Sequence, residues 1–239
     1  MKNRANALFA VAVLICLIPA TGLALMPYNQ DFEGLNQADT AALGNDGWLV
    51  YANVFGPDWA YWYGYGPFPA PNDGFGFCQI AAGEGGIGQG AQQLVAFSDY
   101  NNGDHGNSAF IESLVFQEMI IGPGDVSEDW VFEFHAKMGN LEGSSTALAF
   151  IKTLDPGAGW ATTNYITLDM TAIPANWAAY ALSITIDPSL DGQILQIGFQ
   201  NIATNYEGSG VFYDNVRFYP TGPVGTEEMS FGAVKSLFR

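Results

Sequence analysis

The sequence has few basic residues. Its 239 residues include 7 Lys and Arg against 24 Asp and Glu, which gives a formal net charge of −17. A field of this sign repels nucleic-acid phosphates and anionic lipid headgroups, so neither is an expected partner. The acidity suits an exported surface that collects cations, or a surface that is simply soluble.

Cysteine is equally scarce. One of the two cysteines, Cys16, lies in the N-terminal apolar segment described below, so Cys78 is alone in the rest of the chain and no internal disulfide can form. The apolar neighbours Phe77 and Ile80 predict that Cys78 is a buried, inert thiol. Stability must therefore come from a hydrophobic core, with a bound metal as a further source.

The residues that usually carry catalysis are sparse. His105 and His135 are the only histidines, and neither has the spacing of a zinc site or of a Ser-His-Asp arrangement. Glu128–Glu133 lacks the carboxylate pattern of jelly-roll glucanases, and Gly83–Gly88 lacks the Lys-Ser/Thr of a phosphate-binding loop. The sequence predicts a non-catalytic protein, and a polysaccharide-degrading enzyme is the alternative.

The first 24 residues have the pattern of a secretory signal. Lys2 and Arg4 give the positive start, Leu8–Pro19 the short apolar run, and a small-x-small cleavage motif ends at Ala24. The mature chain is then expected to begin at Leu25 and to be secreted or held at the cell surface. The run is short for a membrane span, which makes insertion after cleavage unexpected, and an uncleaved anchor is the alternative.

Alternating apolar and polar residues fill the body of the chain. Strand-like segments are Trp48–Phe55, Phe77–Ala82, Gln93–Asp99, Ala109–Ile121, Trp130–Met138, Thr146–Leu154, Tyr165–Asp169, Ala178–Ile186, Ile194–Gln200 and Val211–Tyr219. Turn signals such as Asp155-Pro156-Gly157 and Asp187-Pro188 separate them. This pattern predicts an all-β antiparallel β-sandwich over residues 25–219, as a single domain.

Residues 220–239 read as a linker and a short C-terminal tail. Phe231, Val234, Leu237 and Phe238 share one face if the tail is helical. Such a face suits a docking segment, and a tail folded back on the sandwich or frayed is the alternative.

Asp214 is the most informative single residue. Strict alternation places it on the same face as Phe212, Val216 and Phe218, with Arg217 on the opposite face. A carboxylate pointing into the core must be protonated, paired with a cation or exposed at the end of the sandwich. A bound Ca²⁺ fits this requirement in an exported protein rich in Asp and Asn.

Several short motifs occur in the order seen in one known group of proteins. They are Asn29-Gln30-Asp31-Phe32-Glu33-Gly34, Gly47-Trp48, Trp177, Leu195-Gln196-Ile197-Gly198-Phe199 and Gly210-Val211-Phe212-Tyr213-Asp214-Asn215-Val216. In this order they resemble the jelly-roll carbohydrate-binding modules, notably families 4, 9, 16 and 22. The resemblance spans about Tyr28 to Tyr219.

This resemblance implies a structural calcium that ties the first strand to the last. The corresponding ligands are Glu33 and Asp214, with Gln89 as a third ligand that supplies an oxygen but no charge. The alternative is an Asp214 that is hydrogen-bonded at the end of a strand.

Aromatic residues gather where a sugar ring could stack. Trp59, Tyr61, Trp62, Tyr63 and Tyr65 form the densest platform, and the alternative is that these rings cap an open edge of the sandwich.

Further candidates are Gln196 and Gln200 on the wetter face of their strand, and Trp160 and Tyr206 in loops; a solvated face without a ligand is the alternative for each. We therefore expect a secreted carbohydrate-binding protein whose partner is a polysaccharide or glycan. A structural or adhesive surface protein that associates with itself or with an envelope component is the alternative.

Overall fold

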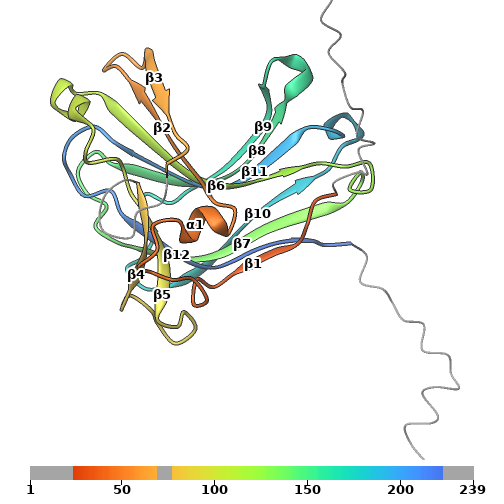
Figure 1. Ribbon diagram of the computed structural model, residues 1–239, viewed down its shortest axis with the longest axis horizontal. Helices are drawn as coiled ribbons and strands as arrows, with labels where there is room; N and C mark the ends of the chain where they lie inside the picture. Colours follow the sequence, from red (N-terminus) through yellow and green to blue (C-terminus); the bar gives the residue numbers. More distant parts are fainter. Residues whose placement is uncertain (1–23, 69–76, 223–239) are drawn as a thin grey trace, which may run out of the picture.

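The computed structural model describes residues 24–68 and 77–222, and these form two antiparallel sheets packed face to face (Figure 1). The strands are β1 (Tyr28–Gln30), β2 (Leu49–Phe55), β3 (Tyr61–Tyr65), β4 (Cys78–Ala82), β5 (Gln92–Ala96), β6 (Phe110–Ile120), β7 (Asp129–Met138), β8 (Thr146–Asp155), β9 (Ala161–Asp169), β10 (Ala178–Thr185), β11 (Ile194–Ala203) and β12 (Val211–Pro220). The helices are α1 (Ala42–Asn45) and the 3₁₀ turns η1 (Gly103–Asn107), η2 (Pro156–Ala158) and η3 (Pro188–Leu190). None of the helices in this part of the chain has the length and apolar character needed to cross a bilayer.

One sheet has the strand order β10-β7-β12-β5-β4, with β1 also paired to β12, and we call it the β12 sheet. The other has the order β3-β2-β6-β11-β8-β9, and we call it the β11 sheet. The all-β antiparallel sandwich expected from the sequence is confirmed. The proposed signal and most of the proposed tail lie outside the described residues.

Aromatic rings fill the space between the sheets. Phe199 of β11 stacks on Tyr213 of β12 with ring centroids 3.6 Å apart and an interplanar angle of 14°. Trp48 also stacks with Phe199, at 6.2 Å, and Phe134 meets both Phe199 and Tyr213 edge-on. These rings are almost fully buried, and they fix the β11 sheet against the β12 sheet.

Each strand segment expected from the alternation contains a strand, because its apolar face packs on the opposite sheet. Asp155 and Asp187 are turn residues as expected, accepting hydrogen bonds from the backbone N–H of Gly157 and Ser189. Cys78 is buried, and burial raises the pKa of its thiol.

Strict alternation is wrong in the middle of β12. The pairing of β12 with β7 shifts between Asp214 and Arg217, which marks a β-bulge. Asn215 sits in this bulge with φ at +50°, a conformation that Asn adopts more readily than most residues.

The bulge exchanges the two faces of β12. Before it, Tyr213 points into the core, and Asp214 lies opposite His135 of β7. After it, Val216 and Phe218 belong to the core cluster. Asp214 is therefore on the outer face of the β12 sheet rather than between the sheets, although it is fully buried.

Gly198 of β11 lies in a closely packed part of the β11 sheet, and a substitution there tests that packing. A Cβ at this position would collide with the Val115 carbonyl oxygen and would lie 2.6 Å from the Phe116 Cβ. We expect Gly198→Ala to lower the free energy of unfolding by about 1–3 kcal/mol in urea denaturation.

Gly44 is the matched control, since a Cβ there meets nothing within 4 Å. Gly44→Ala should leave stability unchanged or raise it by up to about 1 kcal/mol, because Gly44 lies in α1 and Ala favours a helix. A Gly198→Ala protein as stable as the original would contradict the close contact of β6 and β11.

Candidate functional site

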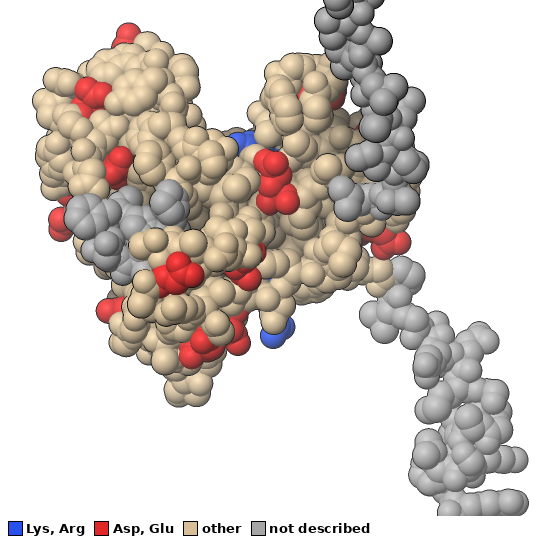
Figure 2. All heavy atoms as spheres, viewed as in Figure 1, with Lys and Arg blue, Asp and Glu red and all other residues tan. Residues whose placement is uncertain are grey.

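The outer face of the β11 sheet is hollowed into a groove. The β2–β3 and β8–β9 hairpins rise on its two sides, and β6 and β11 run between them (Figure 1). Figure 2 shows the hollow between the two arms. The groove has a volume of about 320 Å³, and its lining includes Tyr51, Phe116, Glu118, Lys152, Trp160 and Gln196.

Side chains of β6 alternate between the core and the groove, so this strand contributes residues to both faces of the β11 sheet. Ile111 and Val115 point into buried clusters between the sheets. The intervening residues Glu112, Leu114 and Phe116 lie on the groove face, as does every second residue on the paired strands.

Aromatic rings make the floor of the groove. Tyr51 stacks on Phe116 with centroids 5.8 Å apart and an interplanar angle of 27°. Phe116 lies 6.4 Å from Phe150, and Gly198 of β11 pairs with both. With no side chain on Gly198, the two Phe rings approach each other across β11.

Amide and carboxyl groups follow these rings along the groove. Gln196 Nε2 donates to Glu118 Oε2 at 2.8 Å, while Gln196 Oε1 is buried and accepts no hydrogen bond from the described residues. Tyr165 Oη donates to Gln200 Oε1 at 2.7 Å. The groove therefore offers a free acceptor beside groups already held in place.

Charge in the groove is concentrated on Lys152, Glu112 and Glu118. Burial lowers the pKa of Lys152, and the negative charges of Glu112 and Glu118 oppose that shift. Burial raises the pKa of Glu112, opposed by a hydrogen bond from Asn53 Nδ2 at 2.8 Å and by the charge of Lys152. One cation thus stands between two carboxyl groups in a partly desolvated site.

The predicted aromatic platform divides in two. Trp59 and Tyr61 pack next to the groove lining, beyond Asn53 on β2. Trp59 stacks on Phe110 at 4.0 Å and 18°, and Tyr61 meets Phe55 edge-on at 5.7 Å. Trp59 and Tyr61 are 55% and 61% exposed, which leaves their rings free to meet a ligand.

Two of the remaining platform rings, those of Tyr63 and Tyr65, are held through their hydroxyl groups. Tyr63 Oη donates to Asp104 Oδ2 at 2.6 Å, and Tyr65 Oη donates to Asp99 Oδ2 at 2.7 Å. Trp62 lies in the register shift between β2 and β3. Tyr63 and Tyr65 therefore do not form one surface with Trp59 and Tyr61, whereas the Trp62 ring is 44% exposed and lies against Gly56.

The other predicted ligand-binding residues have different surroundings. Trp160 projects from the β8–β9 turn, 60% exposed, and lines the groove. Tyr206 lies away from the groove, where its hydroxyl donates to the Asn102 carbonyl. Gln196 and Gln200 are on the groove face as expected, but neighbouring side chains bury them, so the expectation of a wet face is wrong.

Sequence reasoning missed much of the groove. The missed residues are Tyr51, Asn53, Phe55, Phe110, Glu112, Phe116, Glu118, Lys152 and Tyr165. The sequence of β6 could have indicated some of these residues, because Phe and Glu residues alternate there with the core residues. An outward face that mixes rings and carboxyl groups differs from an ordinary solvated face.

The sequence matches no protein-family model and no curated protein. Solved structures similar to the chain include a family 16 carbohydrate-binding module, with 12% identity, a TM-score of 0.40 and coverage of 62% of this chain and 89% of the other. Carbohydrate-binding modules are thus among the structures of similar fold.

Two enzymes have a similar arrangement. One is the Stig cyclase Fisc from Fischerella sp. TAU, with 12% identity, a TM-score of 0.47 and coverage of 82% of this chain and 98% of that one. The other is the enzymatically active domain of bacteriophage CBA120 tailspike protein 4, with 15% identity, a TM-score of 0.47 and coverage of 78% of this chain but only 21% of the tailspike chain. These likenesses concern the fold alone.

A second group of polar residues surrounds Asp214. The same edge of β12 pairs with β5 through Val211–Tyr213 and with β1 through Val216–Phe218, so Asp214 lies at the gap between them. Asp214 Oδ1 accepts from the Asn215 backbone N–H, and the buried Oδ2 has no partner among the described residues. Burial raises the pKa of Asp214 to about 7, and the negative charges of Asp31 and Glu33 add to the shift.

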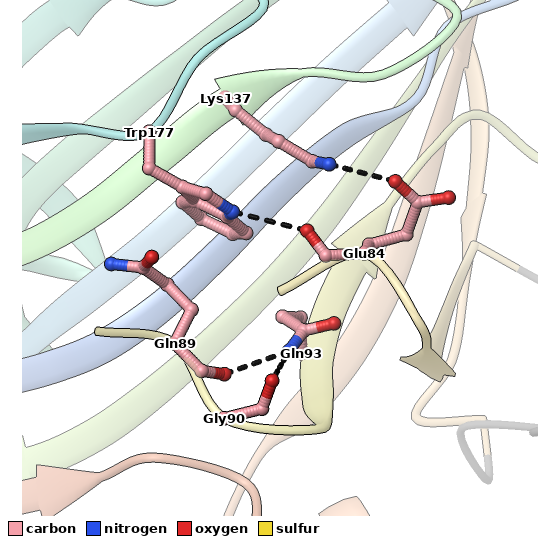
Figure 3. A network of polar contacts seen from close by, with 6 residues as sticks. All are labelled: Glu84, Gln89, Gly90, Gln93, Lys137 and Trp177. Atoms are coloured by element: carbon pink, nitrogen blue, oxygen red, sulfur yellow. Dashed lines mark hydrogen bonds and ion pairs between the residues drawn. The ribbon is translucent and has the colours of Figure 1, made fainter. Parts of the chain in front are cut away.

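The loop of residues 83–91 reaches this corner, where Asn215 Nδ2 donates to the Gly88 carbonyl at 2.8 Å. Figure 3 shows the contacts that hold the loop in place. Lys137 Nζ bonds Glu84 Oε2 at 2.7 Å, and Trp177 Nε1 donates to the Glu84 carbonyl at 3.0 Å. Gln93 Nε2 donates to the Gln89 carbonyl at 2.8 Å. Both ends of the loop are thereby tied to the β12 sheet.

Beyond the loop, Glu33 is anchored by backbone donors. Glu33 Oε1 accepts from the N–H groups of Ala91 and Gln92, each at 2.7 Å. The neighbouring Gly90 has φ at +56°, and a Cβ there would collide with the Glu33 carboxylate. Only glycine lets the loop close on Glu33 in this way.

The predicted metal ligands are only partly brought together. Glu33 and Asp214 are within electrostatic range of each other, but the Gln89 amide nitrogen bonds His135 Nδ1 at 2.8 Å. Within the described residues, no group of three or more His, Cys, Asp and Glu has an arrangement that could hold a metal. Any ion bound here would need amide or backbone oxygens beside the carboxylates.

A larger hollow of about 620 Å³ lies on the outer face of the β12 sheet. Its lining includes the apolar side chains of Val95, Phe97 and Phe212, and its acidic residue Glu84 is already paired with Lys137. The smaller groove has the stacked floor, the unsatisfied Gln196 acceptor and the exposed rings at its ends, so we place the candidate site there.

Glu112 gives a prediction about pH. Its folded-state pKa lies above the unfolded value, so the folded state binds more protons and stability falls as pH rises from about 4.5 through the folded pKa. Glu112→Gln removes this titration and keeps an acceptor for Asn53.

The measurement is the free energy of unfolding from pH 4 to 8. The original protein should lose stability relative to Glu112→Gln as pH rises. Parallel curves for the two proteins would contradict the raised pKa of Glu112.

Proposed function

We propose that the protein binds a neutral polysaccharide chain in the groove of the β11 sheet, without cleaving it. The observation that carries this proposal is the stacked Tyr51–Phe116 floor beside the Gln196–Glu118 pair, between the exposed rings of Trp59 and Trp160. Sugar rings have apolar faces that pack on aromatic rings, and hydroxyl edges that need amide and carboxylate partners.

The hydrogen-bonding groups favour a ligand rich in hydroxyl groups. Gln196 Oε1 is buried without a donor, and leaving a buried acceptor unpaired costs about 1–3 kcal/mol. A sugar hydroxyl can donate to this oxygen and accept from Lys152, which lines the same groove.

The charges favour a neutral glycan over an acidic one. Lys152 is already flanked by Glu112 and Glu118, whose charges act on it. A uronate or sulfate near Lys152 would also face these two carboxyl groups, and the protein carries a net charge of −17. A neutral chain avoids this repulsion.

The spacing of the groove carboxyl groups supports binding rather than hydrolysis. Glu112 and Glu118 lie six residues apart on β6, which corresponds to roughly 20 Å along a strand. Glycosidases place their two carboxyl groups about 5–9.5 Å apart.

An extracellular location belongs to the same proposal, because the sequence predicts a secretory signal at its N-terminus.

A structural Ca²⁺ at the Asp214 corner is a further part of this proposal. Three observations support it: Asp214 Oδ2 is buried without a partner, Asp31 and Glu33 add negative charge, and the Gly90 turn closes on Glu33. A divalent ion would offset the charge and join β12 to the segment after β1. Glu33 and Asp214 would supply its carboxylates, with Gln89 needing to turn from His135 to contribute.

Trp160→Ala should weaken binding to the best of a panel of neutral polysaccharides about tenfold, because a stacked ring contributes about 0.5–1.5 kcal/mol beyond its buried area. Affinity electrophoresis or calorimetry gives the comparison. Tyr206→Ala is the matched control, since Tyr206 has similar exposure, 61%, but lies away from the groove. Equal binding by the original protein and both variants would place the site elsewhere.

Calcium should raise the midpoint of thermal unfolding by a few °C at millimolar concentration, because an ion that binds only the folded state stabilises it. Asp214→Asn should abolish most of this shift, and Asp191→Asn, in an exposed turn, should keep it. The same melting curve with calcium and with excess chelator would contradict the calcium site.

A further inference from the structure

Asp125 is a buried carboxylate that accepts a hydrogen bond from the backbone N–H of a residue 100 positions earlier in the chain. Asp125 Oδ2 accepts from the N–H of Leu25 at 2.8 Å and from the N–H of Gly122 at 2.8 Å. Asp125 is 4% exposed, and the Leu25 side chain is 3% exposed within the main core cluster. The nitrogen of Leu25 is thereby fixed beside the carboxylate.

Among the residues that the structure describes, no side-chain cation is paired with this carboxylate. The ion pairs found in the described part of the chain join Lys137 to Glu84 and Arg217 to Glu133. A buried carboxylate that has only neutral donors is costly, and a cation at the position of one donor would reduce that cost.

The sequence indicates how the Leu25 nitrogen could itself become this cation. The small-x-small motif of the predicted signal ends at Ala24, so cleavage after Ala24 would make the Leu25 nitrogen the α-amino group of the chain. This motif and the burial of Leu25 are independent observations that point to the same peptide bond.

We propose that Leu25 is the first residue of the mature protein and that its α-ammonium forms a buried ion pair with Asp125, which completes the fold. A peptidase selective for small residues adds water across the Ala24–Leu25 bond. Ala24 leaves as a carboxylate, and the Leu25 amine takes up a proton, since free α-amino groups have a pKa of about 7.7–8.0.

The order of events follows from burial. Leu25 belongs to the core, so the bond before it must be cut while this segment is still unfolded. In the cleaved chain, the hydrogen bond that the Asp125 carboxylate accepts from Leu25 comes from an ammonium in place of an amide N–H, so both partners carry a charge.

The experiment compares chains that begin at Leu25 with chains that keep Gly22-Leu23-Ala24 in front of it. Three extra residues carry the ammonium up to about 10 Å away and leave an amide at Leu25. Each chain is also made with Asp125→Asn, and with Asp191→Asn as the control at an exposed turn residue.

We expect the extension to lower the midpoint of thermal unfolding by about 5 °C in the original and Asp191→Asn backgrounds, and by less than about 1 °C with Asp125→Asn. An extension effect of equal size in all three backgrounds, or no effect in any, would overturn the ion pair.

Two further measurements keep the proposal testable if Asp125→Asn does not fold. Acetylation of the Leu25 amine in the chain that begins there should lower the midpoint as the extension does, and an unchanged midpoint would contradict the pair. Intact mass of the exported protein should correspond to residues 25–239, and any other first residue would overturn the assignment.

Discussion

The stacking of Phe199 on Tyr213, at 3.6 Å between ring centroids, is the contact on which the rest of the structure depends. It joins the middle of the β11 sheet to β12 and fixes which residues of both strands face inward. On β11, Gln196, Gly198 and Gln200 must then face the groove. On β12, alternation from the inward-facing Tyr213 places Asp214 on the outer face, and the bulge that follows returns Val216 and Phe218 to the core. One inter-sheet contact thus sets both the groove and the acidic corner.

The groove differs from an ordinary solvated sheet face because its side chains are already ordered. Phe116 and Phe150 close over Gly198, and Tyr165 and Glu118 hold the two glutamines by hydrogen bonds. A ligand that meets such a surface loses less conformational entropy on binding than one that must order free side chains. The exposed rings at the groove ends extend the surface in the direction of a chain-like ligand.

Much of the fold was readable from the sequence, because a half-buried strand must alternate and the turns carry Asp, Pro and Gly. The exposed strand β3 and the bulge in β12 were not, since neither is dictated by local pattern: β3 forms by pairing with β2, and the bulge depends on Asn215 adopting a positive φ. Only part of the candidate groove was predicted. Trp160 and Gln196 were predicted as ligand-binding residues and line the groove, whereas the pairing of β6, β11 and β8 was needed to bring Glu112 and Lys152 to the same face.

The most direct measurement of the central claim is a titration followed by the indole N–H resonances of the tryptophans, with neutral hexasaccharides of several linkages as ligands. We predict that the resonances of Trp160 and Trp59 move with at least one of these, while those of the buried Trp48 and Trp130 stay in place. Shifts confined to Trp177, beside the loop of residues 83–91, or no shift with any neutral oligosaccharide, would contradict binding in the groove.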